Sequence, residues 1–154
     1  MLGNLTNTEI DELLNKSQFG HLGCHSDGKT YVVPISFAFD NTRIVGLTTP
    51  GLKVDLMRKN PEVCVCVDDI VSLTNWRSII LWGQFEELEG QEAAVATGLL
   101  IDKYGPIFEE MGTLARRGRN VTPDRLDGNF VAPIVYCIRI SEKSGRFESE
   151  EALT

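Results

Sequence analysis

Hydrophobic positions follow a helical period near the N-terminus and a strand period soon afterwards. Within residues 6–17, apolar side chains recur at helical spacing and form a single stripe, which is typical of an amphipathic helix. The stripe consists of Ile10, Leu13 and Leu14. Thr6 and Glu9 have the spacing of a capping box, in which each side chain bonds the other residue's backbone N–H. We therefore predict a short helix that begins at Thr6.

Residues 19–39 alternate at strand period and predict two strands joined by a tight turn at 26–29. The turn contains Asp27-Gly28, a strong sequence signal for a β-hairpin. Pro34 interrupts the second run, and a proline has no N–H to donate to a neighbouring strand. Pro34 therefore indicates an edge strand, a bulge or a break that faces a ligand.

The middle of the chain alternates between strand and helix patterns. We predict a turn at 40–42, a strand at 43–48, a helix at about 53–59, a strand at 62–69 and a long strand at 75–88. The helix is expected to end at Asn60-Pro61, because proline disfavours helical geometry in the residue before it. Gly83 lies in the middle of the long strand and indicates a bulge there.

The last third contains one more helix and one more strand. We predict a helix at 91–105 that closes near Gly105-Pro106. Its residues at helical spacing are Ala93, Ala96, Leu99, Leu100 and Lys103. Residues 111–129 show no clear period, and 132–142 predict a final strand. An acidic tail from about 147 to 154 is expected to be mobile.

The count is about six strands, mostly joined by short turns, and about three helices. Short turns join antiparallel neighbours, so the predicted class is mainly β with peripheral helices (α+β), built on a β-barrel or curled sheet. A βαβ rhythm and a GxGxxG motif are both missing, which argues against a parallel dinucleotide-binding sheet. Residues 1–154 show no internal repeat and are expected to form a single domain.

Charge and composition exclude several classes of protein. The net charge of −7 argues against nonspecific binding to nucleic acid, which needs basic residues to neutralise phosphates. No apolar stretch approaches the ~20 residues that span a bilayer. The N-terminus has no basic segment followed by an apolar run, so we expect no signal peptide and a cytoplasmic location.

The four cysteines all lie within apolar runs. Cys64 and Cys66 share one face of a strand, but no second Cys pair or nearby His pair completes a zinc pattern. We interpret the cysteines as buried, reduced thiols and predict no metal site.

The stretch from Thr48 to Pro61, TTPGLKVDLMRKNP, is the first candidate for chemistry. Thr48 and Thr49 emerge at a strand end with hydroxyls free to donate hydrogen bonds, and Pro50-Gly51 can turn the backbone sharply. Lys53 lies at the start of the next helix, where free N–H groups and the helix dipole favour an anion. The segment is either a phosphate cradle or an ordinary turn with a solvated lysine.

A second candidate segment opens the long strand. Trp76, Arg77 and Ser78 supply a large ring, a cation and a hydroxyl. If this strand start lay beside Lys53, it would complete an anion site; otherwise Trp76 belongs to the core and Arg77 to the surface. Arg116, Arg117 and Arg119 form a further basic run, interpreted either as a solvated loop or as an arm that meets an anion.

In the order and spacing of these segments, the chain resembles the FMN-binding split-barrel proteins related to pyridoxamine 5′-phosphate oxidase. The branch that includes nitroimidazole-resistance proteins is the most similar. The resemblance covers residues 10 to 146 and rests on DGKTYVVPISFAF, TTPGLKVDLMRKNPEVCVCVDD, NWRSIILWGQFEEL and the late IRISEKSGR. It implies a six-stranded antiparallel split β-barrel and a homodimer that holds two FMN molecules at the subunit interface.

The resemblance also assigns roles to individual residues. Lys53 matches the lysine that binds the FMN phosphate, and Thr48 and Thr49 lie beside the phosphate or the ribityl chain. The segment of Pro34, Ile35 and Ser36 runs along the isoalloxazine ring and offers it backbone groups. The remaining matches are Trp76, Arg77 and Ser78, the last two as further phosphate ligands.

The chain departs from the family pattern at two places. Position 47 is Leu, where relatives often carry a histidine before the two threonines, so any role of that histidine is absent here. The chain ends in SEEALT and lacks the C-terminal Arg-Leu-x-Pro-like ending that helps pyridoxamine phosphate oxidases bind their substrate. That specific activity is therefore not expected.

The leading hypothesis is an FMN-dependent oxidoreductase that passes hydride or electrons to an unknown small molecule. Because the flavin supplies the chemistry, we assign no catalytic side chain. One alternative is a non-enzymatic sensor or carrier of flavin or haem; His21 and His25 share one strand face and could serve a haem. A deazaflavin-dependent reductase is another.

Overall fold

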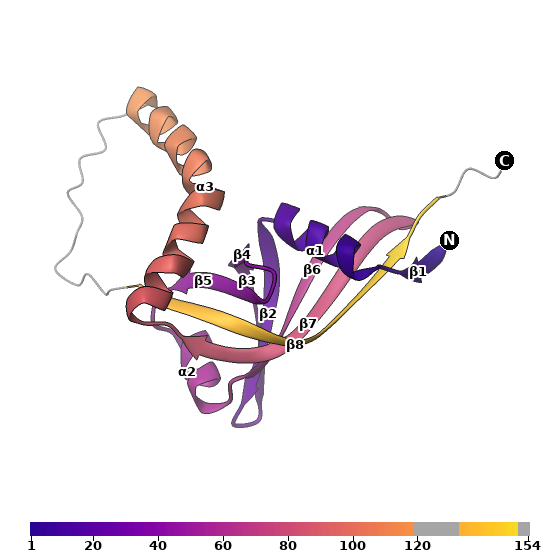
Figure 1. Ribbon diagram of the computed structural model, residues 1–154, viewed down its shortest axis with the longest axis horizontal. Coiled ribbons are helices and arrows are strands. Elements are labelled where there is room, and N and C mark those ends of the chain that lie inside the picture. The colour runs from indigo at the N-terminus through magenta and orange to yellow at the C-terminus, as the bar shows by residue number, and fades with distance from the viewer. Residues whose placement is uncertain (119–132, 151–154) are drawn as a thin grey trace.

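A computed structural model describes residues 1–118 and 133–150. One antiparallel sheet and three helices make up this part of the chain (Figure 1). In chain order the elements are β1 Leu2–Asn4, α1 Asn7–Lys16, β2 Phe19–Ser26, β3 Lys29–Ser36, β4 Ala38–Phe39, β5 Arg43–Thr48, α2 Leu52–Lys59, β6 Glu62–Ser72, β7 Asn75–Glu87, α3 Gly90–Gly118 and β8 Ile134–Glu148.

The strand order is β3-β2-β6-β7-β8-β5-β4, with β1 paired to the end of β8. The sheet curls so strongly that β3 comes close to β5, yet the two do not pair. This arrangement is consistent with a split barrel. The described residues contain eight strands, so the expected count of six is not confirmed. The sequence pattern did not indicate the three residues of β1 or separate the two residues of β4 from β3.

Local signals read from the sequence are confirmed at three places. Thr6 and Glu9 form the predicted capping box at the start of α1. Asp27 and Gly28 adopt φ angles of 52° and 73° in the hairpin turn, as a primed turn requires. The pairing of β7 with β8 shifts register between Trp82 and Gly83, which is the predicted bulge.

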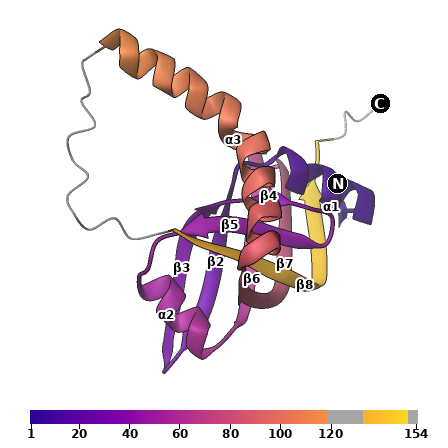
Figure 2. The same ribbon diagram turned by 60° about the vertical axis from the view of Figure 1, so that its left-hand side comes forward.

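Helix α3 does not end near Gly105-Pro106 as predicted but continues to Gly118. An internal proline removes one backbone hydrogen bond and bends a helix, and α3 changes direction along its length (Figure 2). The unpatterned segment 111–129 is therefore partly helical, since 111–118 belong to α3. Its remaining residues lie outside the described part of the chain.

The prediction of a mobile tail is wrong for residues 147 and 148, which belong to strand β8. Strand β8 reaches Glu148 because it finds a partner on each edge: Phe147 pairs with Gly3 of β1 and with Arg77 of β7. Ser149 extends this contact by hydrogen-bonding Met1. Residues 151–154 of the tail lie outside the described residues.

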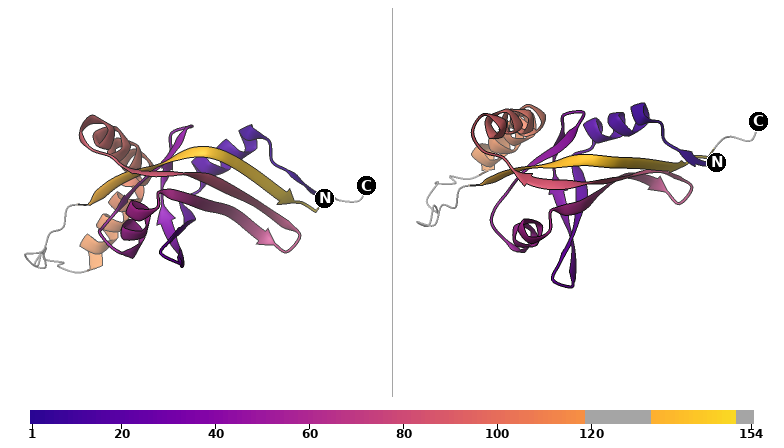
Figure 3. Two further views of the ribbon diagram at one scale, coloured as in Figure 1. Left: turned by 90° about the horizontal axis from the view of Figure 1, so that it is seen from below. Right: turned by 60° about the horizontal axis from the view of Figure 1, so that its bottom comes forward.

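Two hydrophobic clusters stabilise the arrangement. The larger one fills the curled sheet and is closed by α1 and α2, with Leu14, Leu22, Met57 and Val65 fully buried. The smaller one lies under α3, where Ala96 and Leu100 pack on the outer side of β5 and β8. The right-hand view of Figure 3 shows α1 and α3 on one side of β8 and α2 on the other. None of the described helices is long and apolar enough to cross a membrane.

Candidate functional site

The sheet is open between β3 and β5, which come close together but do not pair. Strand β4 pairs with β5 through Ala38↔Val45 and Phe39↔Ile44, but the chain before Phe37 bends away to pair with β2. Pro34 is exposed on β3, which is an end strand of the sheet, so the edge-strand interpretation of Pro34 is confirmed. The opening thus has Ser36 on one side and Leu47 on the other.

A cavity of about 410 Å³ lies at this opening, between the sheet and α3. Its wall is mostly apolar, and Ser36 and Gln18 supply polar side chains. The lining residues are Gln18, Phe19, Ser36, Leu47, Leu100, Ile101, Tyr104, Gly105 and Ile107. One predicted site residue, Ser36, and the residue marked as a departure from the family, Leu47, therefore share a cavity.

The two threonines and the start of α2 follow directly on the β5 side of the opening. Thr48 is half-buried and its hydroxyl donates to the carbonyl of Thr49 over 3.1 Å. Gly51 is the N-cap of α2, and no side chain caps the first backbone N–H groups of this helix. Uncapped N–H groups at a helix start carry partial positive charge and attract anions.

Lys53 differs from the other basic residues of α2. Arg58 and Lys59 pair with Glu87 and Asp27, whereas no carboxylate in the described residues pairs with Lys53. Its ammonium group is half-buried near the thiol of Cys24, and this burial lowers the pKa of Lys53. A half-buried cation is unfavourable without a counter-ion, so an anion at this place would stabilise the charged form.

Trp76, Arg77 and Ser78 lie elsewhere in the single chain. Lys53 is near Cys24, which is level with Val63 of β6 and, through it, with Gly83 of β7. Ser78 is five residues farther along β7, or about 16 Å at the usual rise of a strand. In Figure 1, α2 is at the lower left and the β6–β7 turn at the upper right. The chain alone does not bring the two segments together.

Trp76 and Arg77 also have side-chain partners of their own. The Trp76 indole donates to Glu148 over 3.2 Å, and Arg77 forms an ion pair with Asp69 at 2.9 Å. Because side chains alternate along a strand, Ser78 faces the opposite side of the sheet from Arg77. Their role as cofactor ligands stays a prediction.

Sequence reasoning missed the contacts that attach α3 to the cavity wall. The hydroxyl of Tyr104 donates to the carbonyl of Gln18 or Phe37, both 2.6 Å away, and accepts from the Phe37 N–H at 2.9 Å. Lys103 donates to the carbonyls of Ser17 and Phe37. Burial lowers the pKa of Lys103 to about 8. The sequence did contain a signal for this contact, because Lys103 lies on the apolar face of its helix, where a charged residue needs a partner.

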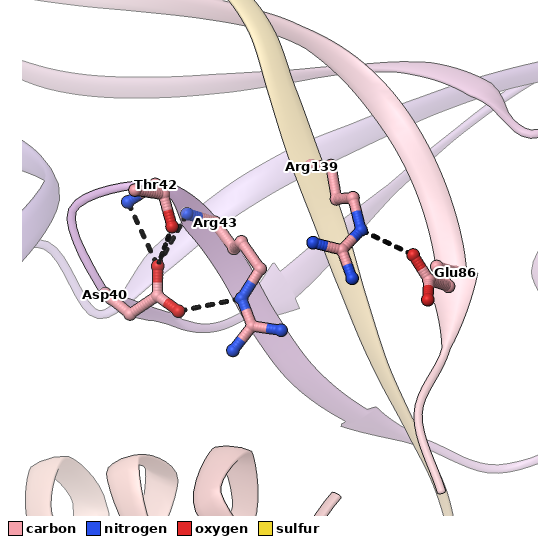
Figure 4. A network of polar contacts seen from close by, with 5 residues as sticks. All are labelled: Asp40, Thr42, Arg43, Glu86 and Arg139. Carbon is pink, nitrogen blue, oxygen red and sulfur yellow. Dashed lines mark hydrogen bonds and ion pairs between the residues drawn. The ribbon is translucent and has the colours of Figure 1, made fainter. Parts of the chain in front are cut away.

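A second polar cluster, outside the opening, satisfies its own charges (Figure 4). Arg43 of β5 lies opposite Arg139 of β8, and each arginine pairs with a carboxylate, Asp40 and Glu86 respectively. Burial alone would raise the pKa of Asp40, but hydrogen bonds from Arg43 and Thr42 outweigh it and hold the pKa below its usual value. With both cations paired, this cluster is not an anion site.

The other candidate residues are distributed over the sheet. His21 and His25 are exposed on the same face of β2, as predicted. All four cysteines are free; Cys24 and Cys137 are buried, but Cys64 and Cys66 are only half-buried. The expectation of buried thiols therefore holds for two of the four.

The chain matches the model of the family described as pyridoxamine 5′-phosphate oxidase over residues 6–147. It therefore belongs to the pyridoxamine 5′-phosphate oxidase-like family. An uncharacterised protein of Rhizobium meliloti (strain 1021) is 27% identical over 146 residues, which cover 92% of each chain.

Solved structures share the fold. A FAD-binding protein of Mesorhizobium loti is 25% identical with a TM-score of 0.75, covering 97% of this chain and 98% of that one. A proposed 5-nitroimidazole antibiotic resistance protein of Bacteroides thetaiotaomicron is 16% identical with a TM-score of 0.68, covering 98% and 92%. A haem storage protein of Vibrio cholerae is 11% identical with a TM-score of 0.66, covering 92% and 93%.

Proposed function

We propose that this protein is an FMN-binding oxidoreductase that exchanges hydride or electrons with a small molecule. The observation that carries the proposal is Lys53, a half-buried cation without a carboxylate partner in the described residues, beside the uncapped start of α2. Family membership and the fold shared with a FAD-binding protein support a flavin as the ligand. The described residues offer one such phosphate cradle, which suits the one phosphate of FMN.

Each part of the opening has a task in this proposal. Lys53 and the first N–H groups of α2 bind the phosphate, with the hydroxyls of Thr48 and Thr49 beside it; charge-assisted hydrogen bonds of this kind contribute roughly 1.5–3 kcal/mol each. The free edge of β3 at Pro34, Ile35 and Ser36 orients the isoalloxazine ring. The bound flavin supplies the redox chemistry, and the chain supplies binding, orientation and exclusion of water.

The proposal includes a homodimer with the cofactor at the subunit interface. Trp76, Arg77 and Ser78 lie too far from Lys53 to join its site within one chain, and a partner subunit could supply them. The outer face of the sheet also exposes large apolar side chains, among them Val32 and Trp82, as a surface that packs against another protein does. A cytoplasmic location stays a prediction from the sequence.

The test is the visible absorption spectrum of the freshly purified protein, followed by titration with FMN. We expect a bound flavin, or uptake of one equivalent of FMN per chain. A colourless protein that binds no FMN would sink the proposal. Reduction of the bound flavin by NADH or NADPH, followed by reoxidation by an acceptor, would distinguish an enzyme from a carrier.

A haem carrier is the second candidate, because His21 and His25 are exposed on one face of β2 and a haem storage protein has this fold. The same spectrum separates the two, since haem shows a Soret band and a flavin does not. A deazaflavin-dependent reductase would take up neither FMN nor haem but would bind an added deazaflavin in a separate titration.

A further inference from the structure

The cavity at the opening has a composition of its own. Among the described residues that line it, none carries a formal charge. Its volume of about 410 Å³ falls in the ~300–1,000 Å³ range of small-molecule sites, which are mostly apolar with a few polar groups. Ser36 and Gln18 match that minority of polar groups.

The polar groups of α3 nearest the cavity are already occupied. Tyr104 uses its hydroxyl on backbone groups of Gln18 and Phe37, and Lys103 directs its ammonium to the carbonyls of Ser17 and Phe37. The Tyr104 hydroxyl and two of the three ammonium donors of Lys103 are therefore engaged, and Lys103 is not among the residues that line the cavity. The α3 wall therefore presents the Tyr104 ring and the aliphatic side chains of Leu100, Ile101 and Ile107.

Three apolar side chains of the wall are unusually open to water. The exposed fractions are 67% for Phe19, 42% for Leu47 and 62% for Ile101. They come from three different elements, β2, β5 and α3, and meet at one cavity. Exposed apolar side chains that converge on a concave site are typical of a ligand-binding surface rather than of scattered surface residues.

We infer that this cavity binds a neutral, mostly apolar small molecule, oriented by the Ser36 hydroxyl and the Gln18 amide. A phosphorylated or carboxylated ligand would lose hydration there without meeting a cation on the described wall, and such a loss is costly. Naming this molecule as the substrate rests on the proposed function, because Ser36 also borders the proposed flavin ring. The inference that the cavity binds such a molecule does not rest on the proposed function.

Calorimetric titration at pH 7 with two probes that share one ring system tests the inference: neutral 2-naphthol and anionic 2-naphthalenesulfonate. We expect 2-naphthol to bind at least about tenfold more tightly than the sulfonate, a difference of ~1.4 kcal/mol. Ile101→Glu and Leu47→Glu place a carboxylate in the wall at exposed positions, and each should weaken 2-naphthol by about tenfold or more.

The matched control is Val95→Glu, on the same helix as Ile101 and 50% exposed but outside the cavity. It should leave 2-naphthol binding within about twofold of the unmodified protein. Equal binding of both probes, no binding of 2-naphthol at ~1 mM, or an equal loss in Val95→Glu would overturn the inference. If a second copy of the chain filled the cavity, 2-naphthol would not bind, and the inference would be overturned.

Parallel titration with FMN keeps the two proposals separate. If 2-naphthol binds as expected and FMN does not, the flavin proposal fails and the cavity assignment stands. If FMN binds and 2-naphthol does not, the cavity assignment fails alone.

Discussion

Lys103 of α3 donates a hydrogen bond to the carbonyl of Phe37 over 2.9 Å, and its ammonium lies 4.5 Å from the centre of the Phe37 ring. Phe37 is the residue at which the chain passes from β3 to β4 and the sheet opens. The contact therefore joins the helix that walls the cavity to the point where the cavity begins. It also leaves a lysine charge half-buried without a carboxylate partner in the described residues.

Stability should depend on the protonation of Lys103. Because the pKa of about 8 lies below the usual 10.5, the unfolded chain binds this proton more tightly than the folded one. Between pH 8 and 10.5, folding therefore becomes more favourable as the pH rises. Relative to Lys103→Met, the unmodified protein should gain ~1 kcal/mol of unfolding free energy across this window, a figure reduced because the ammonium keeps part of its hydration. Urea unfolding at several pH values measures the gain, and a constant difference would contradict it.

Tyr104→Phe should destabilise the fold by about 1–3 kcal/mol, because it leaves the Phe37 N–H without its partner. The control is Tyr31→Phe, because the Tyr31 hydroxyl has no hydrogen bond to the described residues. This variant should change the unfolding free energy by less than ~0.5 kcal/mol. Urea denaturation compares the two variants. Equal effects would remove the Tyr104 hydroxyl from the attachment of α3.

Lys53→Ala should weaken FMN binding by about tenfold or more, since the phosphate loses its cation. Lys59→Ala is the matched control: it lies on the same helix, but its ammonium is exposed and paired with Asp27. Flavin fluorescence titration gives both dissociation constants. If Lys59→Ala weakens FMN as much as Lys53→Ala, the effect is general electrostatics and Lys53 is not a specific ligand.

Mixing two variants tests whether the site crosses a dimer interface. If Lys53 of one subunit and Arg77 of the other share a site, a twofold dimer of Lys53→Ala with Arg77→Ala contains one intact site and one doubly altered site. An equal mixture with random exchange should then recover about a quarter of the tight FMN sites. If both residues serve the same subunit's site, the mixture recovers none.

Gly83→Ala should be strongly destabilising, by more than about 3 kcal/mol or enough to prevent folding. A Cβ at this bulge would lie 2.2 Å from the carbonyl oxygen of Arg139, and neither backbone can move aside without breaking the β7–β8 pairing. Gly98→Ala, in α3 with open space around it, should instead stabilise by about 0.5–1 kcal/mol through helix propensity. Thermal unfolding of the two variants measures whether each change lowers or raises the stability of the fold.

Residue-level signals predicted the local structure well. The capping box at Thr6, the turn at Asp27-Gly28 and the bulge at Gly83 depend on neighbours in the chain or on backbone geometry at one position. Pro106 misled the prediction because a proline often marks a helix end, whereas α3 continues through it, and Ile107 just beyond it still packs against the smaller hydrophobic cluster. Residues 147–148 were predicted to be mobile because the tail is acidic, whereas in the structure they pair with both β1 and β7.

Local sequence signals were enough to predict the mainly β class and the order of most elements, and they also predict an anion site around Lys53, which stays a prediction. These follow from periodicity, turn chemistry and helix-end electrostatics, which act over a few residues. The folded chain was needed to show that Ser36 and Leu47 share a cavity, that Lys103 and Tyr104 attach α3 to the backbone of the sheet beside it, and that Arg77 lies far from Lys53. Such relationships join residues distant in the chain, and they depend on how the sheet curls and where it opens, which no local pattern specifies.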